Sequence, residues 1–85
     1  MNTVYTTDGL KHWVSTSRPG DRVSYYNGFL MYDKEKLVQR GVSPEHFPEE
    51  IRVAQTAWWH YIYGDVTLYQ SKKGDAEYEY VAVRI

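Results

Sequence analysis

Hydrophobic and polar residues alternate most regularly near the C-terminus, where the pattern predicts a β-hairpin. Residues 65–71 and 76–84 place apolar side chains at every second position, as strands with one buried face do. The sequence between them, Lys72-Lys73-Gly74-Asp75, contains residue types that tight turns favour. Because two strands alone are only marginally stable in water, we expect a third antiparallel strand at 22–26 to pair with them.

Apolar residues spaced by three and four positions predict helices in the rest of the chain. The first helix is expected at about 8–17, with Asp8 as its N-cap. The second is expected at 34–40, after an N-cap at Asp33. The third and longest is expected at 48–63, which gives an order of helix, strand, two helices and a hairpin.

The dipeptide Asn27-Gly28 allows two interpretations. Asn-Gly is a strong signal for a two-residue hairpin turn, because both central residues of that turn need a positive φ. On this interpretation residues 29–32 form a return strand. On the other, the chain leaves the sheet at Gly28 and leads directly into the second helix.

The third helix contains two adjacent tryptophans, which cannot both face inward because neighbouring helical residues lie ~100° apart. We assign Trp58 to the core and Trp59 to a partly exposed patch with Tyr63. The expected core follows the same periodicities throughout the chain. Its predicted members are Leu10, Trp13, Val14, Val23, Leu30, Leu37, Ile51, Ala54, Trp58, Tyr61, Ile62, Val66, Leu68 and Val81.

The predicted order of elements resembles that of a winged helix. We therefore expect one α+β domain over residues 1–85, with three helices packed on a small antiparallel sheet and the C-terminal hairpin as the wing. Winged helices usually present one helix and one hairpin to a nucleic acid or a protein. Because the resemblance lies in element order alone, it assigns no binding residue.

Several short segments between residues 19 and 84 resemble small uncharacterised bacteriophage proteins. The resemblance implies a phage origin and a cytoplasmic site of action, without implying an activity. The residues that carry it are Tyr25-Tyr26-Asn27-Gly28-Phe29-Leu30, Asp33, Ala54, Ala57-Trp58, Gly64-Asp65-Val66-Thr67-Leu68-Tyr69-Gln70 and Glu79-Tyr80-Val81-Ala82-Val83-Arg84.

Composition and charge narrow the function classes. The 85 residues carry ten Lys and Arg against eleven Asp and Glu, which gives a formal charge of −1. A charge this close to zero supports neither binding to a polyanion nor mimicry of DNA. The chain has no cysteine, which excludes disulfides and thiolate zinc sites. The N-terminus lacks a signal-peptide pattern, and no apolar run is long enough to span a bilayer. We expect a cytoplasmic protein that does not enter membranes.

The sequence contains no catalytic pattern, and we expect neither an enzyme nor a metal or organic cofactor. His12, His46 and His60 are too far apart in sequence to form a helical i, i+4 pair. The serines and carboxylates occur outside any nucleophile elbow, triad or Gly-rich phosphate loop.

Nucleic-acid binding is the first functional hypothesis. On the third helix, Arg52 suits guanine, Gln55 suits adenine, and Thr56 suits a thymine methyl group or a phosphate. Lys72 and Lys73 at the hairpin tip could contact the phosphate backbone. Against this hypothesis, glutamates precede and begin the third helix, where they would repel phosphates while complementing the helix dipole.

Protein docking is the alternative hypothesis. Trp59 and Tyr63 would form an exposed aromatic patch that contacts a host or phage protein, either to bind it or to inhibit it. A homodimer is also left open. The opposing interpretation is that Trp59 packs beneath the wing or the N-terminal arm. The combined candidate set is Arg52, Gln55, Thr56, Trp59, Tyr63, Lys72 and Lys73.

Overall fold

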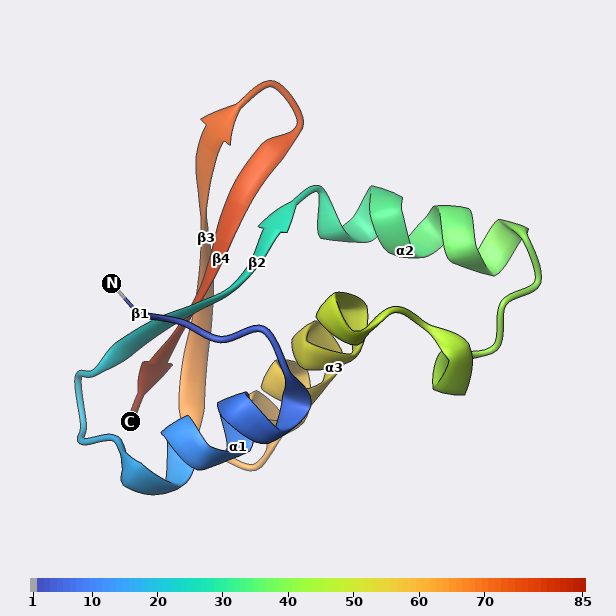
Figure 1. Cartoon of the computed structure of the whole chain (residues 1–85). Coiled ribbons are helices and arrows are strands. Elements are labelled where there is room, and N and C mark those ends of the chain that lie inside the picture. The colour runs from blue at the N-terminus through green and yellow to red at the C-terminus, as the bar shows by residue number, and fades with distance from the viewer. Residues whose placement is uncertain (1) are drawn as a thin grey trace.

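The computed structural model describes residues 2–85, which form an α+β fold of three α-helices and a four-stranded sheet (Figure 1). The fold class and the order of the predicted elements are confirmed, and the winged-helix resemblance stays a prediction. In chain order the elements are β1 (Asn2–Thr3), α1 (Thr7–Thr16), β2 (Arg22–Gly28), α2 (Leu30–Gln39), the 3-10 helix η1 (Pro44–His46), α3 (Glu49–Ile62), β3 (Val66–Gly74) and β4 (Glu77–Arg84).

The sheet has the strand order β1-β2-β4-β3 and is mixed, not purely antiparallel as predicted. β4 pairs antiparallel with both β2 and β3, whereas β1 pairs parallel with β2 through Asn2 opposite Val23. A parallel pair needs a crossover connection, and α1 supplies it between β1 and β2. A strand of two residues is too short to show alternation, which explains why the sequence did not reveal it.

The Asn27-Gly28 dipeptide lies within β2, opposite Glu79 and Tyr78 of β4, so the hairpin interpretation is wrong. Instead, α2 begins at Leu30, four residues earlier than predicted. Gly28 has φ +139°, a conformation that side-chain-bearing residues rarely adopt, and it allows the chain to turn out of the sheet.

Two tyrosine hydroxyls of the sheet hold the start of α2. The Tyr80 hydroxyl accepts a hydrogen bond from the backbone N–H of Leu30 at 3.1 Å. The Tyr26 hydroxyl donates to Oδ2 of Asp33 at 2.5 Å. Asp33 is therefore a first-turn residue of α2 and not its N-cap, because tertiary hydrogen bonds determine where this helix starts.

The other two helices lie within one residue of their predicted positions. The N-cap of α1 is Thr6 and not Asp8: Oγ1 of Thr6 accepts a hydrogen bond from the backbone N–H of Gly9 at 2.9 Å. Asp8 lies in the first turn, where its charge complements the helix dipole. None of the helices in residues 2–85 is long and apolar enough to cross a membrane.

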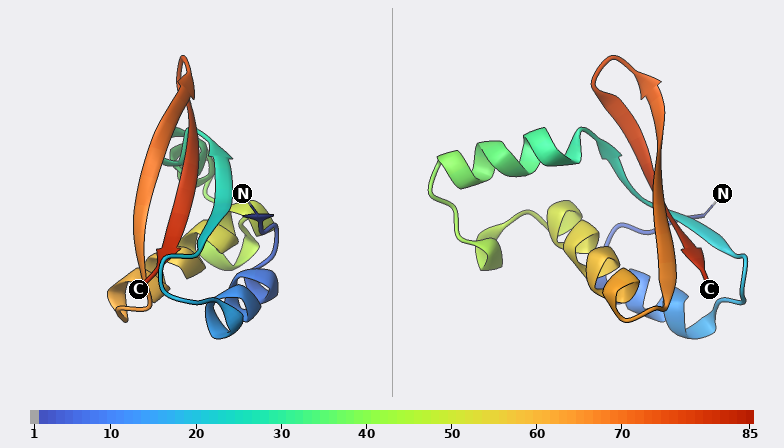
Figure 2. Two further views of the ribbon diagram at one scale, coloured as in Figure 1. Left: turned by 90° about the vertical axis from the view of Figure 1, so that its left-hand side faces the viewer. Right: turned by 180° about the vertical axis from the view of Figure 1, so that it is seen from behind.

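The core lies where α1 and α3 pack against each other and against the sheet, while the β3–β4 hairpin and α2 extend away from it (Figure 2). Seven predicted core residues are buried and four are half-buried against the core. The buried ones are Leu10, Val14, Val23, Ile51, Ala54, Val66 and Val81, and the half-buried ones are Trp13, Leu30, Leu37 and Leu68.

The assignment of Trp58, Tyr61 and Ile62 to the core is wrong, because all three are about half exposed. The side of α3 that meets the sheet instead carries the small residues Val53 and Ala57, which allow close packing. The prediction also missed other buried residues. They are Tyr25, Tyr26, Phe47, Val53, Ala57, Tyr80 and Ala82.

Candidate functional site

Helix α3 has two exposed sides, which the 100° step of the helix separates. The first, here called the outer face, consists of Arg52, Thr56, Trp59 and Tyr63. The second, here called the groove face, points towards α2 and carries Ile51, Ala54, Gln55 and Trp58, of which Ile51 and Ala54 are buried. The two faces meet at Trp59, which also borders the groove.

The outer face carries a pair of aromatic rings at its C-terminal end. Trp59 is 57% exposed and Tyr63 is 72% exposed. Their rings are stacked, with centroids 6.1 Å apart and an interplanar angle of 24°. The i, i+4 spacing brings the two side chains together on one helix surface. The two rings thus contact each other while remaining accessible to a partner.

The polar residues of the outer face are engaged within the helix itself. The Arg52 guanidinium forms an ion pair with the Glu49 carboxylate one turn earlier. The Thr56 hydroxyl donates to the carbonyl oxygen of Arg52 at 3.0 Å. Gln55, which was predicted on this face, is half-buried and lines the groove beside Trp58. The three predicted base-contacting residues therefore do not form one accessible polar surface.

The N-terminal end of α3 is acidic, and one of its carboxylates has a structural role. Oε1 of Glu49 accepts a hydrogen bond from the backbone N–H of Thr7 at 2.8 Å. This hydrogen bond, together with the nearby Arg52, lowers the pKa of Glu49 below its ordinary value. Glu49 stays ionised, and with Glu50 it places negative charge where a recognition helix would approach phosphates.

The hairpin lysines lie far from the outer face. The C-terminal end of α3 leads into the start of β3, whereas Lys72 and Lys73 lie at the end of β3. At ~3.3 Å per residue, this strand separates its two ends by roughly 25 Å, and the separation is visible in both views of Figure 2. Lys73 also lies 3.5 Å from Oε1 of Glu79, which offsets part of its charge.

An open groove of about 340 Å³ lies between α2 and α3. Leu30 and Lys34 form its α2 wall, and Gln55, Trp58 and Trp59 contribute to its α3 wall. Trp58 is 53% exposed, and its ring packs beside that of Tyr61, with centroids 5.3 Å apart. The groove is thus mostly apolar. The sequence did not predict it, because its second wall depends on the direction in which α2 leaves the sheet.

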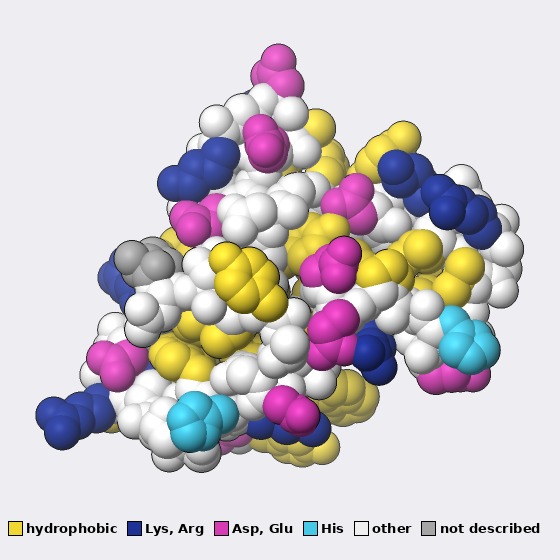
Figure 3. Space-filling model, in the orientation of Figure 1, with side chains coloured by type: hydrophobic (Ala, Val, Ile, Leu, Met, Phe, Trp, Pro, Cys, Tyr) yellow, Lys and Arg dark blue, Asp and Glu magenta, His cyan; other side chains and the backbone are white. Residues whose placement is uncertain are grey.

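The surface lacks a large field of one sign on the face drawn in Figure 3. Acidic side chains lie across the middle of this face, whereas basic ones lie mostly towards its margins. This distribution agrees with the near-neutral formal charge of −1. A polyanion would find positive charge only in separate places on this face.

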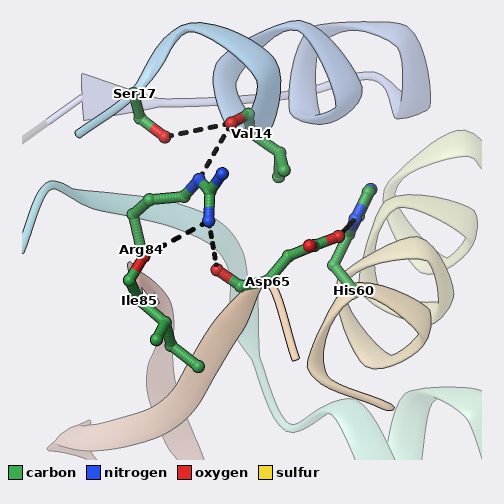
Figure 4. A network of polar contacts seen from close by, with 6 residues as sticks. All are labelled: Val14, Ser17, His60, Asp65, Arg84 and Ile85. Atoms are coloured by element: carbon green, nitrogen blue, oxygen red, sulfur yellow. Dashed lines mark hydrogen bonds and ion pairs between the residues drawn. The ribbon is translucent and has the colours of Figure 1, made fainter. Parts of the chain in front are cut away.

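The most extensive polar network of the core region is structural. The Arg84 guanidinium donates to the carbonyl oxygens of Val14 and Asp65, each at 2.9 Å, and to that of Ile85 at 3.3 Å (Figure 4). Beside it, Nδ1 of His60 lies 2.9 Å from Oδ2 of Asp65. The hydrogen bonds of this guanidinium all go to backbone carbonyl oxygens, so Arg84 of β4 connects α1 with the turn after α3.

A metal site is not apparent in residues 2–85, where no three His, Asp or Glu side chains come together to hold an ion. His46 lies beside the Ser43 hydroxyl and His60 beside Asp65. Each of these pairs links residues close in sequence and fixes a local turn.

Comparison with known proteins identifies no matching family model, no matching curated protein and no matching solved structure. The resemblances to bacteriophage proteins and to winged helices therefore stay predictions.

Proposed function

We propose that the protein is a protein-docking module whose contact surface is centred on Trp59 and Tyr63 of the outer face. The observation that carries this proposal is the stacked arrangement of two rings that are each more than half exposed. Exposed aromatic side chains are enriched at the energetic centres of protein interfaces. Because each ring already restricts the other, binding would cost less side-chain entropy than for a free pair.

The surroundings of the rings also support a protein partner. Arg52 is neutralised by Glu49, so the outer face offers an apolar centre with a locally balanced polar edge. Protein interfaces commonly have such an apolar centre and polar rim. The docked partner would be a protein of the host cell or, following the resemblance above, of a bacteriophage.

A nucleic-acid-binding winged-helix regulator is the second candidate, and the order of the elements favours it. The two exposed rings could also stack on unpaired bases. The distribution of charge argues against it, because Glu49 and Glu50 lie at the N-terminus of α3 and Lys72 lies at the far end of β3.

Site-specific photocrosslinking tests the docking proposal. A photoreactive phenylalanine analogue in place of Tyr63 should form a discrete protein adduct in a lysate of the source cells. The same analogue at Thr67, an exposed position on β3, is the matched control. Trp59→Ala in the Tyr63-labelled chain should abolish the adduct. Failure to capture any protein from Tyr63, at protein concentrations up to ~100 μM, would contradict the proposal.

A titration with DNA separates the two candidates. Fluorescence anisotropy with mixed-sequence duplex and single-stranded DNA at ~50 and ~200 mM salt should give no binding tighter than ~10⁻⁴ M. Phosphate contacts would instead produce a steep loss of affinity between the two salt concentrations. Tight, salt-dependent binding that Trp59→Ala weakens would decide for the nucleic-acid candidate.

A further inference from the structure

Another open pocket lies in the corner between the projecting β3–β4 hairpin and the start of α2 (Figure 1). Its volume of about 450 Å³ is within the ~300–1,000 Å³ of pockets that bind small molecules. This pocket, here called the hairpin pocket, shares only Leu30 and Lys34 with the groove between α2 and α3. Its lining includes Phe29, Leu30 and Lys34 around the start of α2, Gln70 of β3, and Tyr78 and Tyr80 of β4.

Aromatic rings form an apolar corner in the hairpin pocket. The ring centroids of Phe29 and Tyr78 lie 5.5 Å apart with an interplanar angle of 83°, which is an edge-to-face contact. The Tyr80 ring follows that of Tyr78, with centroids 6.3 Å apart. A flat ligand ring in this corner would stack on one ring and meet the edge of another, the two arrangements that aromatic pairs prefer. The corner therefore favours a planar aromatic group.

The hairpin pocket has one charged side chain in its lining, that of Lys34. Its ammonium forms no ion pair with an acidic side chain in the part of the chain that the structure describes. Lys72 adds positive charge beside the pocket, because it pairs with Tyr78 in the β3–β4 register and so lies on the same face of the sheet. The one lysine of the lining balances one negative charge, which matches a carboxylate better than a phosphate of about −1.5 to −2.

The Tyr80 hydroxyl supplies a hydrogen-bond donor to the hairpin pocket. Tyr80 is 8% exposed, and its oxygen accepts the hydrogen bond from the Leu30 N–H. The hydroxyl proton itself has no acceptor among the described residues. Buried donors are normally hydrogen-bonded, so an acceptor oxygen of a ligand would complete this site. Gln70, which pairs with Tyr80 across the two strands, adds a side-chain amide on the same face.

We propose that the hairpin pocket binds an aromatic carboxylate, in which a planar ring lies a few bonds away from the carboxylate group. The ring would lie in the corner formed by Phe29 and Tyr78. The carboxylate would pair with the Lys34 ammonium and accept a hydrogen bond from the Tyr80 hydroxyl. Free aromatic acids contain such a group, and so do protein C-termini that end in an aromatic residue. This inference goes beyond the docking proposal, because neither Trp59 nor Tyr63 lines the hairpin pocket.

Titrations followed by amide NMR test the site. The probes are indole-3-acetate, 4-hydroxyphenylacetate and the tripeptide Gly-Gly-Trp with a free C-terminus. At least one should bind saturably with a Kd of ~1 mM or tighter, which ligands of this size reach at ordinary ligand efficiency. The backbone amide signals of Leu30 and Gln70 should shift, whereas that of Tyr63 should not. The neutral amide of the same probe should bind at least ~10-fold more weakly, because it lacks the charge that pairs with Lys34.

Charge variants test the role of Lys34. Lys34→Gln should weaken binding of the acid at least ~10-fold and leave binding of the neutral amide unchanged, so that the preference for the acid disappears. Lys36→Gln removes the same charge from the same helix and should keep the preference, because Lys36 lies over the Tyr32 ring outside the lining. Gln70→Glu should weaken binding of the acid more than that of the amide. All three positions are exposed, and circular dichroism would verify that the fold persists.

Two results would overturn the site. One is that none of the three probes shifts the pocket amides saturably up to ~10 mM, and the other is a preference for the acid that survives Lys34→Gln. Tighter binding of the tripeptide than of the free acids would assign the pocket to a protein C-terminus, and the reverse order would assign it to a free aromatic acid. Tyr63→Ala should leave binding of the probes unchanged, so the failure of either proposal leaves the other standing.

Discussion

The carboxylate of Glu49 accepts a hydrogen bond from the backbone N–H of Thr7 at 2.8 Å, and thereby joins the start of α3 to the start of α1. The two residues are 42 positions apart in the sequence. The same carboxylate pairs with Arg52. Its role is thus to connect two helices and to neutralise the one arginine of the outer face, which reduces the positive charge available to a nucleic acid.

Replacing Glu49 with Gln should lower the melting temperature at pH 7, and replacing it with Ala should lower it further. Glutamine keeps an acceptor for the Thr7 N–H and loses the charge, whereas alanine loses both. The pKa of Glu49 is lowered in the folded state, so its ionised form stabilises the fold above its ordinary pKa. That stabilisation is lost as pH falls through the lowered pKa.

Thermal unfolding from about pH 7 to pH 3 measures this effect. The difference in melting temperature between the parent and Glu49→Gln should shrink as the parent carboxylate becomes protonated. A difference that stays constant over this range would show that the charge of Glu49 does not stabilise the fold.

Truncating Val53 should destabilise the fold more than truncating Trp58, although Val53 is far smaller. Val53 is 0% exposed, so Val53→Ala removes buried methyl groups and should cost about 1–3 kcal/mol. Trp58 is 53% exposed, and Trp58→Ala should cost less than the ~3–5 kcal/mol of a buried ring. Urea unfolding of both variants measures the two losses of stability. A larger loss of stability for Trp58→Ala than for Val53→Ala would show that Trp58 contributes to the core.

Local patterns in the sequence predicted most elements correctly, because caps, turns and alternation act over a few residues. α3 and the hairpin lie close to their predicted positions. The predicted start of α2 was wrong because hydrogen bonds to Tyr26 of β2 and Tyr80 of β4 hold its first turn. A local sequence pattern does not reveal such tertiary contacts. The core side of α3 was predicted only in part: Ile51 and Ala54 are buried as predicted, whereas the small Ala57 is buried in place of the larger Trp58.

The candidate surface could be predicted only in part. The 3.6-residue period correctly brought Arg52, Trp59 and Tyr63 to one exposed side of α3. It could not reveal that Lys72 lies at the far end of β3, because that depends on the direction of the hairpin. The groove lies between two helices, and its existence depends on the angle at which the chain leaves Gly28.

Replacing Arg84 with Lys should destabilise the fold by about 1.5–3 kcal/mol, the usual contribution of hydrogen bonds to a charged group. The planar guanidinium reaches the carbonyl oxygens of Val14 and Asp65 at the same time. A lysine ammonium keeps the charge but lacks this fork geometry. Arg18→Lys, at an exposed position, is the control and should change stability little. Equal urea midpoints for the two variants would contradict the structural role of Arg84.

Alkaline pH should destabilise the fold through Tyr25. Its side chain is 6% exposed, and burial, together with the nearby Tyr80, raises its pKa from 10.0 to about 12. The folded state therefore keeps the Tyr25 proton at pH values where the unfolded chain has lost it. Stability is fully present below about pH 10 and falls as pH rises towards about 12, at ~1.4 kcal/mol per pH unit for one such group. Burial and the hydrogen bond to Asp33 raise the pKa of Tyr26 as well, so the two tyrosines act in the same direction.

Urea unfolding at about pH 9, 10.5 and 12 would measure this loss of stability. Tyr25→Phe preserves the ring and removes the titrating hydroxyl, so its stability should fall less steeply between about pH 10 and 12. At pH 7 the variant should be close to the parent, because the ring packing between β2 and β4 is retained. If the two proteins lose stability in parallel, Tyr25 does not titrate as a buried group, and the alkaline sensitivity must come from Tyr26 or from other residues common to both chains.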